Sequence, residues 1–307
     1  MVRCMSVPLT AIIVAHDSAG ILPECLAALA RDGVPALVID NASGDNTVRV
    51  AEGAGARVIR NPKNEGYGRA NDIGVAAAET PFCLILNPDI VLDPGAVAEL
   101  LAAADRYPDA GLWAPSLIED DGRFFFQNRS LLSESVLGHP VAGDARDVPP
   151  EGDCCAPFLS GACFLVRREV FLGLGGFDPN IFLFYEDDDL CRRMQDAGRA
   201  LVHVHGAVAR HGRGQSAPPT PARRYRSRWH YGWSRVYIAR KYGLATGVGR
   251  TLAMNLPKAI GSLFTLRRME IARYWGVVLG TLGGWRGASA IAREGLEERE
   301  ERRPPLR

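Results

Sequence analysis

The first ninety residues alternate between short apolar runs and segments that mix polar and apolar residues. An apolar run of about four to eight residues that stops at a turn signal is typical of a strand buried on both faces of a parallel sheet. Strands that alternate with helices predict parallel pairing and a doubly wound, mostly parallel α/β sheet. The predicted strands are 9–15, 35–40, 57–60 and 82–86, and the predicted helices run from about 20 to 31, up to about 53, from about 69 to 78 and onward from Pro94.

The middle of the chain breaks this alternation. Residues 119–157 are rich in Pro, Gly and charged side chains, which is unusual for so long a segment within a compact domain. We interpret it as a segment that covers the substrate or faces the acceptor. Apolar runs on either side of it predict three further strands, at 111–114, 158–166 and 201–205.

The chain changes character again from Pro218, where basic and aromatic residues interleave. We therefore divide it into an α/β domain, 1–216, and a helical extension, 217–307. The charged, proline-terminated tail, 294–307, is expected to be frayed. Within the extension, the predicted helices follow Pro218 and then cover about 248–265 and 269–284.

Polar residues stand where the predicted parallel strands end. Because parallel strands place all their carboxyl ends on one edge, these residues are expected to converge there. Asp40 can accept hydrogen bonds from ribose hydroxyls or from a base N–H, although a turn or capping role is the alternative. The loop 64–68 offers backbone N–H groups to an anion beside a helix start, although Gly66 and Gly68 also suit a simple turn.

The stretch Asn87-Pro88-Asp89 ends the most apolar of these strands. A carboxylate at this position suits a divalent metal and, through it, a diphosphate, whereas a surface turn is the alternative. The segment after the first strand, 15–20, lacks the G-x-G-x-x-G pattern. That absence excludes a dinucleotide-binding dehydrogenase.

Four motifs, at 12–16, 38–45, 61–71 and 86–89, together resemble the family 2 glycosyltransferases, and in particular the bacterial rhamnosyltransferase-like enzymes. The resemblance implies a GT-A fold, with Asp40 contacting the nucleotide base and Asp89 binding Mn²⁺ or Mg²⁺. It departs at Asn87, where many members of the family have Asp. The nucleotide-binding candidates are Ala15, His16, Asp40, Asn64, Gly66, Asn71 and Asn87.

Four consecutive acids, 186–189, follow an aromatic run. A helix N-terminus explains part of this cluster, because carboxylates complement the helix dipole. Successive helical residues point about 100° apart, so we expect Glu186 and Asp187 to face inward, Asp188 to cap, and Asp189 to pair with Arg192 or Arg193. By the same resemblance, Asp187 is the catalytic base and Glu186 its neighbour.

Histidines add a second candidate metal site. His203, His205 and His211 could bind zinc together, or the first two could line the edge of the core from one strand face. The family resemblance instead places His211 beside the metal and the diphosphate, with Asp89.

Charge is distributed unevenly along the chain. Residues 1–209 contain 16 basic and 29 acidic side chains, whereas 210–307 contain 20 basic and 6 acidic ones. Interleaved Trp, Tyr, Lys and Arg suit a helix that lies on a membrane surface, and a helical homodimer contact is the alternative. Nucleic-acid binders share this composition, but no recognised motif accompanies it, so we expect no nucleic-acid partner.

The seven cysteines form no C-x-x-C pair, and several lie in apolar runs. We expect reduced thiols, no signal peptide and a cytoplasmic protein at the inner face of the cell membrane. The function expected is inverting transfer of a sugar from a dTDP- or UDP-linked donor to a saccharide or polyprenyl-diphosphate-linked acceptor. A non-catalytic sugar-nucleotide-binding scaffold and a nucleotidyltransferase are the alternatives.

Overall fold

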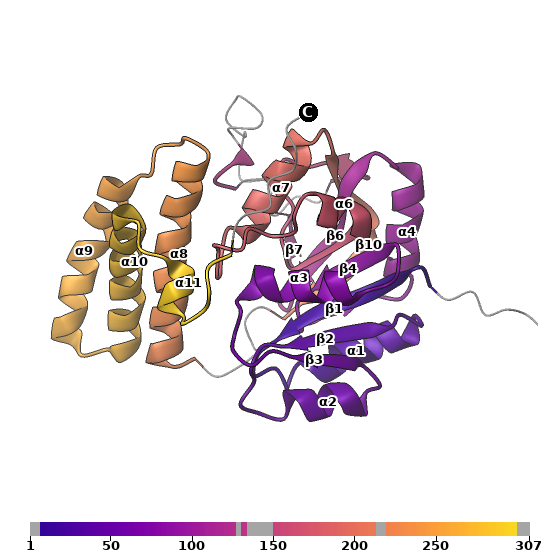
Figure 1. Cartoon of the computed structure of the whole chain (residues 1–307), viewed down its shortest axis with the longest axis horizontal. Helices are drawn as coiled ribbons and strands as arrows, with labels where there is room; N and C mark the ends of the chain where they lie inside the picture. Colours follow the sequence, from indigo (N-terminus) through magenta and orange to yellow (C-terminus); the bar gives the residue numbers. More distant parts are fainter. Residues whose placement is uncertain (1–6, 127–129, 134–149, 213–218, 300–307) are drawn as a thin grey trace, which may run out of the picture.

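The computed structural model describes residues 7–126, 130–133, 150–212 and 219–299. Within these ranges, ten strands form one sheet with helices on both faces, and a bundle of C-terminal helices lies beside it (Figure 1). The strands are β1 (Leu9–Ala15), β2 (Ala36–Asp40), β3 (Arg57–Arg60), β4 (Phe82–Leu86), β5 (Ile90–Leu92), β6 (Ala110–Glu119), β7 (Phe124–Phe125), β8 (Cys154–Cys155), β9 (Cys163–Arg167) and β10 (Ala200–His211). The helices are α1 (Leu22–Arg31), α2 (Thr47–Gly53), α3 (Tyr67–Ala77), α4 (Ala96–Arg106), α6 (Arg168–Gly173), α7 (Glu186–Asp196), α8 (Pro221–Lys241), α9 (Val248–Thr265), α10 (Arg268–Arg286) and α11 (Ala290–Arg293).

The first four strands confirm the predicted parallel sheet. They lie in the order β3-β2-β1-β4, and each neighbouring pair is parallel. Every residue of β4 is buried, as expected for a strand with helices on both of its faces. The apolar residues of this sheet separate into two cores, one facing α1 and α4 and the other facing α3, α6 and α7.

The sheet is mixed beyond β4. Strand β9 inserts between β4 and β6 and is antiparallel to both. It is also shorter than the predicted strand 158–166, because Phe158 and Leu159 bury their side chains from a loop and not from a strand. The predicted strand 111–114 lies in the first half of the longer β6, which pairs in parallel with β10. The sequence analysis did not predict β5, β7, β8 or α6.

The C-terminal helices lie close to their predicted ranges. α10 packs against both α8 and α9, so that α9 is the outermost helix, at the left of Figure 1. α8 and α10 approach closely because α10 carries glycines at the crossing. A Cβ atom at Gly280 would overlap the backbone carbonyl of Trp229. No helix in the described ranges has the length and apolar character needed to cross a bilayer.

The extension is tied to the α/β domain by buried polar contacts. Lys241 Nζ lies 2.7 Å from carboxylate oxygens of both Asp178 and Asp189. Tyr242 donates a hydrogen bond to Asp189 over 2.8 Å. The described part of the segment predicted to be frayed, 294–299, also makes contacts, since Glu294 pairs with His230 over 2.8 Å. The rest of that tail, 300–307, lies outside the described residues.

Candidate active site

The sheet brings the predicted polar residues together through its register. Ala15 pairs with Asp40, and Ile13 pairs with Leu86, so that the ends of β1, β2 and β4 lie side by side. β9 starts at the same edge, because its first residue, Cys163, pairs with Leu86. The backbone N–H of Asn87 then donates to Ala162 O over 2.9 Å. The expected convergence at the carboxyl edge is confirmed for these strands.

The nucleotide end of this edge is built around Asp40 and Asn41. Asp40 is buried, and its Oδ1 atom has no hydrogen-bond partner among the described residues. The side-chain amide of Asn41 donates to Asn64 Oδ1 over 3.1 Å and to Gly66 O over 3.0 Å. Asn41 thus fixes the loop 64–66 beside Asp40. A buried acceptor without a partner is costly, and a base N–H would satisfy it.

Gly66 is required for its backbone geometry and for a close approach. Its φ angle is +84°, which side-chain-bearing residues rarely adopt. A Cβ atom there would overlap the carbonyl oxygen of Phe182, which accepts the Tyr67 N–H over 3.1 Å. The loop therefore does more than turn the chain, because it also joins α3 to the segment that precedes α7.

The remaining nucleotide candidates differ in exposure. His16 is partly exposed, and its Nδ1 atom lies 3.0 Å from Asn41 O. Ala15 is fully buried, and its carbonyl oxygen accepts the Asn41 N–H. Asn71 is also fully buried, and its amide donates to Tyr67 O over 3.0 Å. Ala15 and Asn71 thus support the loops at this edge, and direct contact with a nucleotide stays a prediction for all of these candidates.

Asp89 and His211 form the candidate metal site. β5 runs antiparallel to β10, and its first residue, Ile90, pairs with His211. This register places His211 Nε2 3.6 Å from Asp89 Oδ1, and both side chains are largely buried. The Asp120 carboxylate is close to the same point, since a Cβ atom at Gly212 would contact both Asp89 and Asp120.

A carboxylate and an imidazole together fit Mn²⁺ in donor type. Within the described residues, no group of three or more His, Cys, Asp or Glu side chains has the geometry of a complete metal site. Asp89 and His211 could therefore supply part of a coordination sphere, with phosphate oxygens and water supplying the rest. This incomplete set suits a metal that binds together with a diphosphate.

Glu186 is buried at the start of α7, and Asp187 beside it is partly buried. The Asp187 carboxylate accepts hydrogen bonds from the backbone N–H groups of Gly161 and Asp188, each over 3.0 Å. Burial nevertheless raises the pKa of Asp187. Burial and the adjacent Asp187 charge raise the pKa of Glu186 to about 8, and its Oε2 atom has no partner among the described residues.

The backbone that leads into this pair is strained. Phe184 and Tyr185 have φ angles of +70° and +68°, in a region that bulky residues seldom occupy. Strain of this kind clusters at functional sites, where the surrounding structure enforces it. Here Ser234 of α8 holds the segment by donating to Leu183 O over 2.9 Å. The extension thus helps to position the first turn of α7.

The other two acids of the cluster have structural roles. Asp189 pairs with Arg193 over 2.7 Å, which confirms one of the two expected partners. The prediction that Asp188 caps the helix is wrong, because α7 starts at Glu186 and Tyr185 occupies the N-cap position. Asp188 lies inside the first turn, is buried and accepts the Leu132 N–H over 3.4 Å.

The histidine trio does not form a zinc site. A register shift in β10 between Val204 and Val208 separates His211 from the earlier part of the strand. His203 is buried against the rings of Phe124 and Phe126, whereas His205 is exposed. The alternation had indicated that these two histidines line the core from one strand face. That prediction is wrong, because only His203 is buried.

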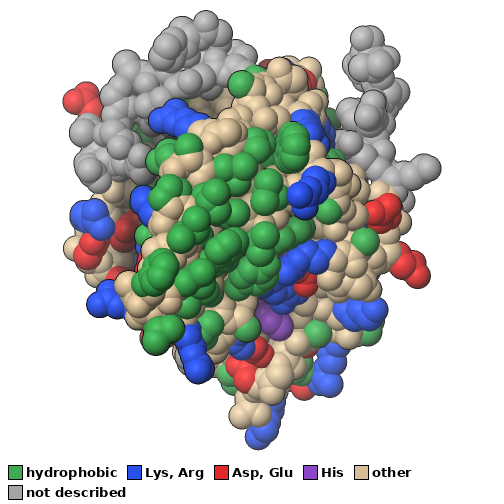
Figure 2. Space-filling view, turned by 90° about the vertical axis from the view of Figure 1, so that its left-hand side faces the viewer, with side chains coloured by type: hydrophobic (Ala, Val, Ile, Leu, Met, Phe, Trp, Pro, Cys, Tyr) green, Lys and Arg blue, Asp and Glu red, His purple; other side chains and the backbone are tan. Residues whose placement is uncertain are grey.

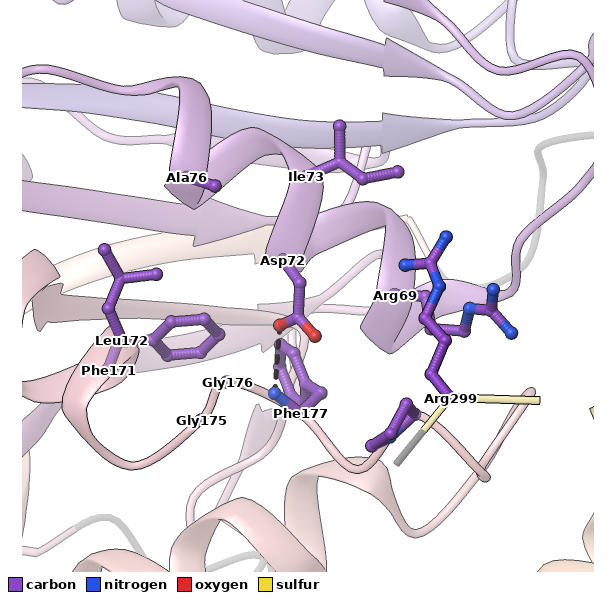
Figure 3. Close-up of a pocket in the computed structure, with 11 residues that line it drawn as sticks. Arg69, Asp72, Ile73, Ala76, Phe171, Leu172, Gly175, Gly176, Phe177 and Arg299 are labelled. Atoms are coloured by element: carbon purple, nitrogen blue, oxygen red, sulfur yellow. Dashed lines mark hydrogen bonds between the residues drawn. The ribbon is translucent and has the colours of Figure 1, made fainter. Parts of the chain in front are cut away.

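A pocket of about 490 Å³ lies between α3, α6 and the segment that follows α6, and its lining includes none of the candidate site residues (Figure 3). Arg69, Asp72 and Arg299 line it together with Phe177, whose N–H donates to Asp72 over 2.9 Å. Arg69 and Asp72 project roughly opposite to Tyr67 on the helix. Tyr67 instead donates to Gly161 O over 2.6 Å, on the Asp187 side. The pocket is thus separate from the candidate catalytic groups.

The candidate residues named from the sequence leave out three residues that organise the site. Asn41 joins two loops, Tyr67 fixes Gly161, and Gly161 holds Asp187. Asn41 directly follows Asp40 at the end of a predicted strand, and this position could have identified it as a candidate site residue. The link from Tyr67 to Gly161 spans 94 residues in sequence, and no local pattern indicates it.

Comparison with protein families identifies the class of protein as the glycosyltransferases. The model described as glycosyl transferase family 2 matches residues 10–175, more than half of the chain, and a second, glycosyltransferase-like family 2, matches residues 151–232. The chain therefore belongs to glycosyl transferase family 2, as the sequence motifs indicated.

Two relatives are rhamnosyltransferases. An N-acetylglucosaminyl-diphospho-decaprenol L-rhamnosyltransferase of Mycobacterium tuberculosis is 32% identical over 214 residues, which cover 62% of this chain and 70% of the relative. The rhamnosyltransferase WbbL of Escherichia coli is 26% identical over 193 residues, covering 57% and 71% of the two chains.

Two solved structures illustrate the fold that this chain shares with known proteins. The mannosyltransferase PcManGT from Pyrobaculum calidifontis, in complex with GDP-Man and Mn²⁺, aligns with a TM-score of 0.55 at 14% identity and covers 91% of this chain and 87% of its own. TarS of S. aureus, in complex with UDP-GlcNAc, aligns with a TM-score of 0.52 at 13% identity and covers 91% and 92%. These likenesses confirm the expected GT-A fold.

Proposed function

We propose that this glycosyltransferase moves a sugar, with rhamnose as the first candidate, from a dTDP- or UDP-linked donor to a polyprenyl-diphosphate-linked saccharide. Cell-wall or polysaccharide assembly at the inner face of the cell membrane is the setting. The names of the rhamnosyltransferase relatives support the sugar and the acceptor. The observation that carries the proposal is the gathering of Asp40, Asp89, His211 and Asp187 around one edge of the sheet.

The donor binds with its base at Asp40 and its diphosphate at Asp89. The partnerless Oδ1 atom of Asp40 accepts a base N–H, and Asn41 and Asn64 hold the loop beside it. Asp89 and His211 would hold a divalent cation, Mn²⁺ or Mg²⁺, which when bound offsets negative charge on the leaving diphosphate.

Asp187 acts as the general base. The acceptor hydroxyl oxygen forms a bond to the anomeric carbon as the bond from that carbon to the phosphate oxygen breaks, and the diphosphate leaves with the electron pair. The hydroxyl proton passes to the Asp187 carboxylate. Attack on the face opposite to the leaving group inverts the anomeric configuration. A raised pKa suits this task, because a base acts best when its pKa is near the operating pH.

The test is Asp187→Asn, assayed by transfer from dTDP-rhamnose and by calorimetric binding of dTDP and UDP. Turnover should fall by roughly 10²- to 10⁴-fold, the usual contribution of a general base, while nucleotide affinity is retained. Asp196→Asn is the matched control, because Asp196 ends the same helix and is half exposed. Transfer at the normal rate by Asp187→Asn would exclude Asp187 as the base.

A further inference from the structure

α9 is folded with its large apolar side chains facing outward. Of its eighteen residues, only Ala259 and Ser262 are buried. Phe264 is 84% exposed, and Leu266, immediately after the helix, is 80% exposed. A helix that packs onto a protein core normally shows the opposite arrangement, with large apolar residues inside.

These side chains form one continuous apolar area on the surface turned toward the viewer in Figure 2. We name it the α9 face. It includes residues of α9, of the turn that follows it and of α10. The large apolar side chains that are exposed in these three segments are Met254, Leu256, Ile260, Leu263, Phe264, Leu266, Leu279 and Trp285.

Basic side chains surround the α9 face, as the blue atoms around the green area show. From 248 to 286 the chain carries six basic residues and one acidic residue, Glu270. Two of the basic groups lie over an aromatic ring, with Lys258 Nζ 6.0 Å and Arg273 Cζ 5.4 Å from the ring centre of Tyr274. The basic residues are Arg250, Lys258, Arg267, Arg268, Arg273 and Arg286.

α9 and α10 form an antiparallel pair, and the side of α10 that faces away from α9 is covered by α8. α10 meets α8 through Gly276, Gly280 and Gly284, at each of which an added Cβ atom would crowd α8. α9 has no such partner on its outer side within the described chain, and it is the helix farthest from the sheet in Figure 1. No other element of the described chain therefore covers the α9 face.

We propose that the α9 face binds an anionic lipid bilayer, with α9 lying in the plane of the interface. The apolar side chains enter the boundary between headgroups and acyl chains, and the basic rim contacts anionic headgroups. The excess of positive charge favours an anionic bilayer over a neutral one and over a second, equally basic copy of this chain. The inference deepens the proposed function by specifying which surface carries the enzyme to its lipid-linked acceptor.

Vesicle binding of the full chain, without nucleotide or acceptor, tests the proposal. The probes are sedimented vesicles of phosphatidylcholine alone and of phosphatidylcholine with phosphatidylglycerol in equal parts. Binding should require phosphatidylglycerol and weaken with added salt. The double variant Phe264→Ser with Leu266→Ser should lose at least about tenfold in partitioning, because two large apolar contacts are removed.

Matched controls replace exposed residues on the α/β domain. Tyr107→Ser with Leu172→Ser removes two comparably large, partly exposed side chains far from α9 and should bind like the wild type. Arg267→Glu should weaken binding, whereas Arg57→Glu on β3 should not. Nucleotide calorimetry on each variant reports an intact fold, and vesicle binding can fail while sugar transfer to a water-soluble acceptor persists.

The proposal would be overturned if the wild-type chain did not bind the anionic vesicles. It would also be overturned if the Phe264 and Leu266 double variant bound them as well as the wild type does. Self-association that is lost in this variant, with vesicle binding unchanged, would assign the α9 face to a second copy of the chain. Analytical ultracentrifugation of the lipid-free proteins separates that outcome from membrane binding.

Discussion

Asp189→Asn tests how the extension is held to the catalytic helix α7. Asp189 is fully buried and contacts three partners from two regions of the chain: Arg193 at 2.7 Å, Lys241 at 2.7 Å and Tyr242 at 2.8 Å. Breaking a buried ion pair by removing one partner costs about 3–5 kcal/mol. Lys241 keeps its second carboxylate, Asp178, so we expect the lower end, about 3 kcal/mol.

Urea denaturation followed by circular dichroism measures this loss in the free energy of unfolding. The pKa of Asp189 is held below its usual value, since Arg193 and Lys241 outweigh the opposing effect of burial. A depressed carboxylate pKa stabilises the fold above the unfolded-state pKa, so the difference from wild type should be full at neutral pH. It should shrink as the pH falls below about 4.

Asp196→Asn is the control for Asp189→Asn. Asp196 pairs with Arg192 at 2.8 Å but is half exposed, and such pairs contribute about 0–1 kcal/mol. If Asp189→Asn is as stable as this control, the buried network does not tie the extension to α7, and the reasoning fails.

Three further predictions concern the edge site. Gly66→Ala should lose about 1–3 kcal/mol more stability than Gly55→Ala, because both need a positive φ but only Gly66 touches the Phe182 carbonyl; equal losses in thermal unfolding would contradict this. The pKa of Glu186 is raised to about 8, so the folded state keeps a proton that the unfolded state loses above about pH 4.5. The free energy of unfolding should therefore fall as the pH rises from about 4.5 to about 8. Urea titrations of Glu186→Gln should show no such fall. Asp89→Asn should weaken UDP or dTDP binding in Mn²⁺ and leave it unchanged in EDTA, and calorimetry showing an equal loss in both would argue against a metal role.

The sequence alone determined most of the scaffold. Three apolar runs predicted β1, β2 and β4, because a strand buried on both faces must be apolar throughout. The fourth parallel strand, β3, is a short edge strand with exposed arginines at both ends. Parallel pairing then required their polar ends to lie at one edge, so the end of β2 at Asp40 and the end of β4 at Leu86 were expected on the same edge with no tertiary information. The helix ranges of the extension were also readable, since α9 and α10 are long segments bounded by turn residues.

Only the tertiary structure decided how distant segments complete the site. The antiparallel insertion of β9 brings Gly161 beside Asp187, and the pairing of β5 with β10 sets His211 against Asp89. Strand direction and register depend on packing across the whole sheet, so a local pattern cannot specify them. The outward face of α9 has the same origin. Its composition permits a core helix as readily as a surface one, and only the packing of α10 leaves Phe264 exposed.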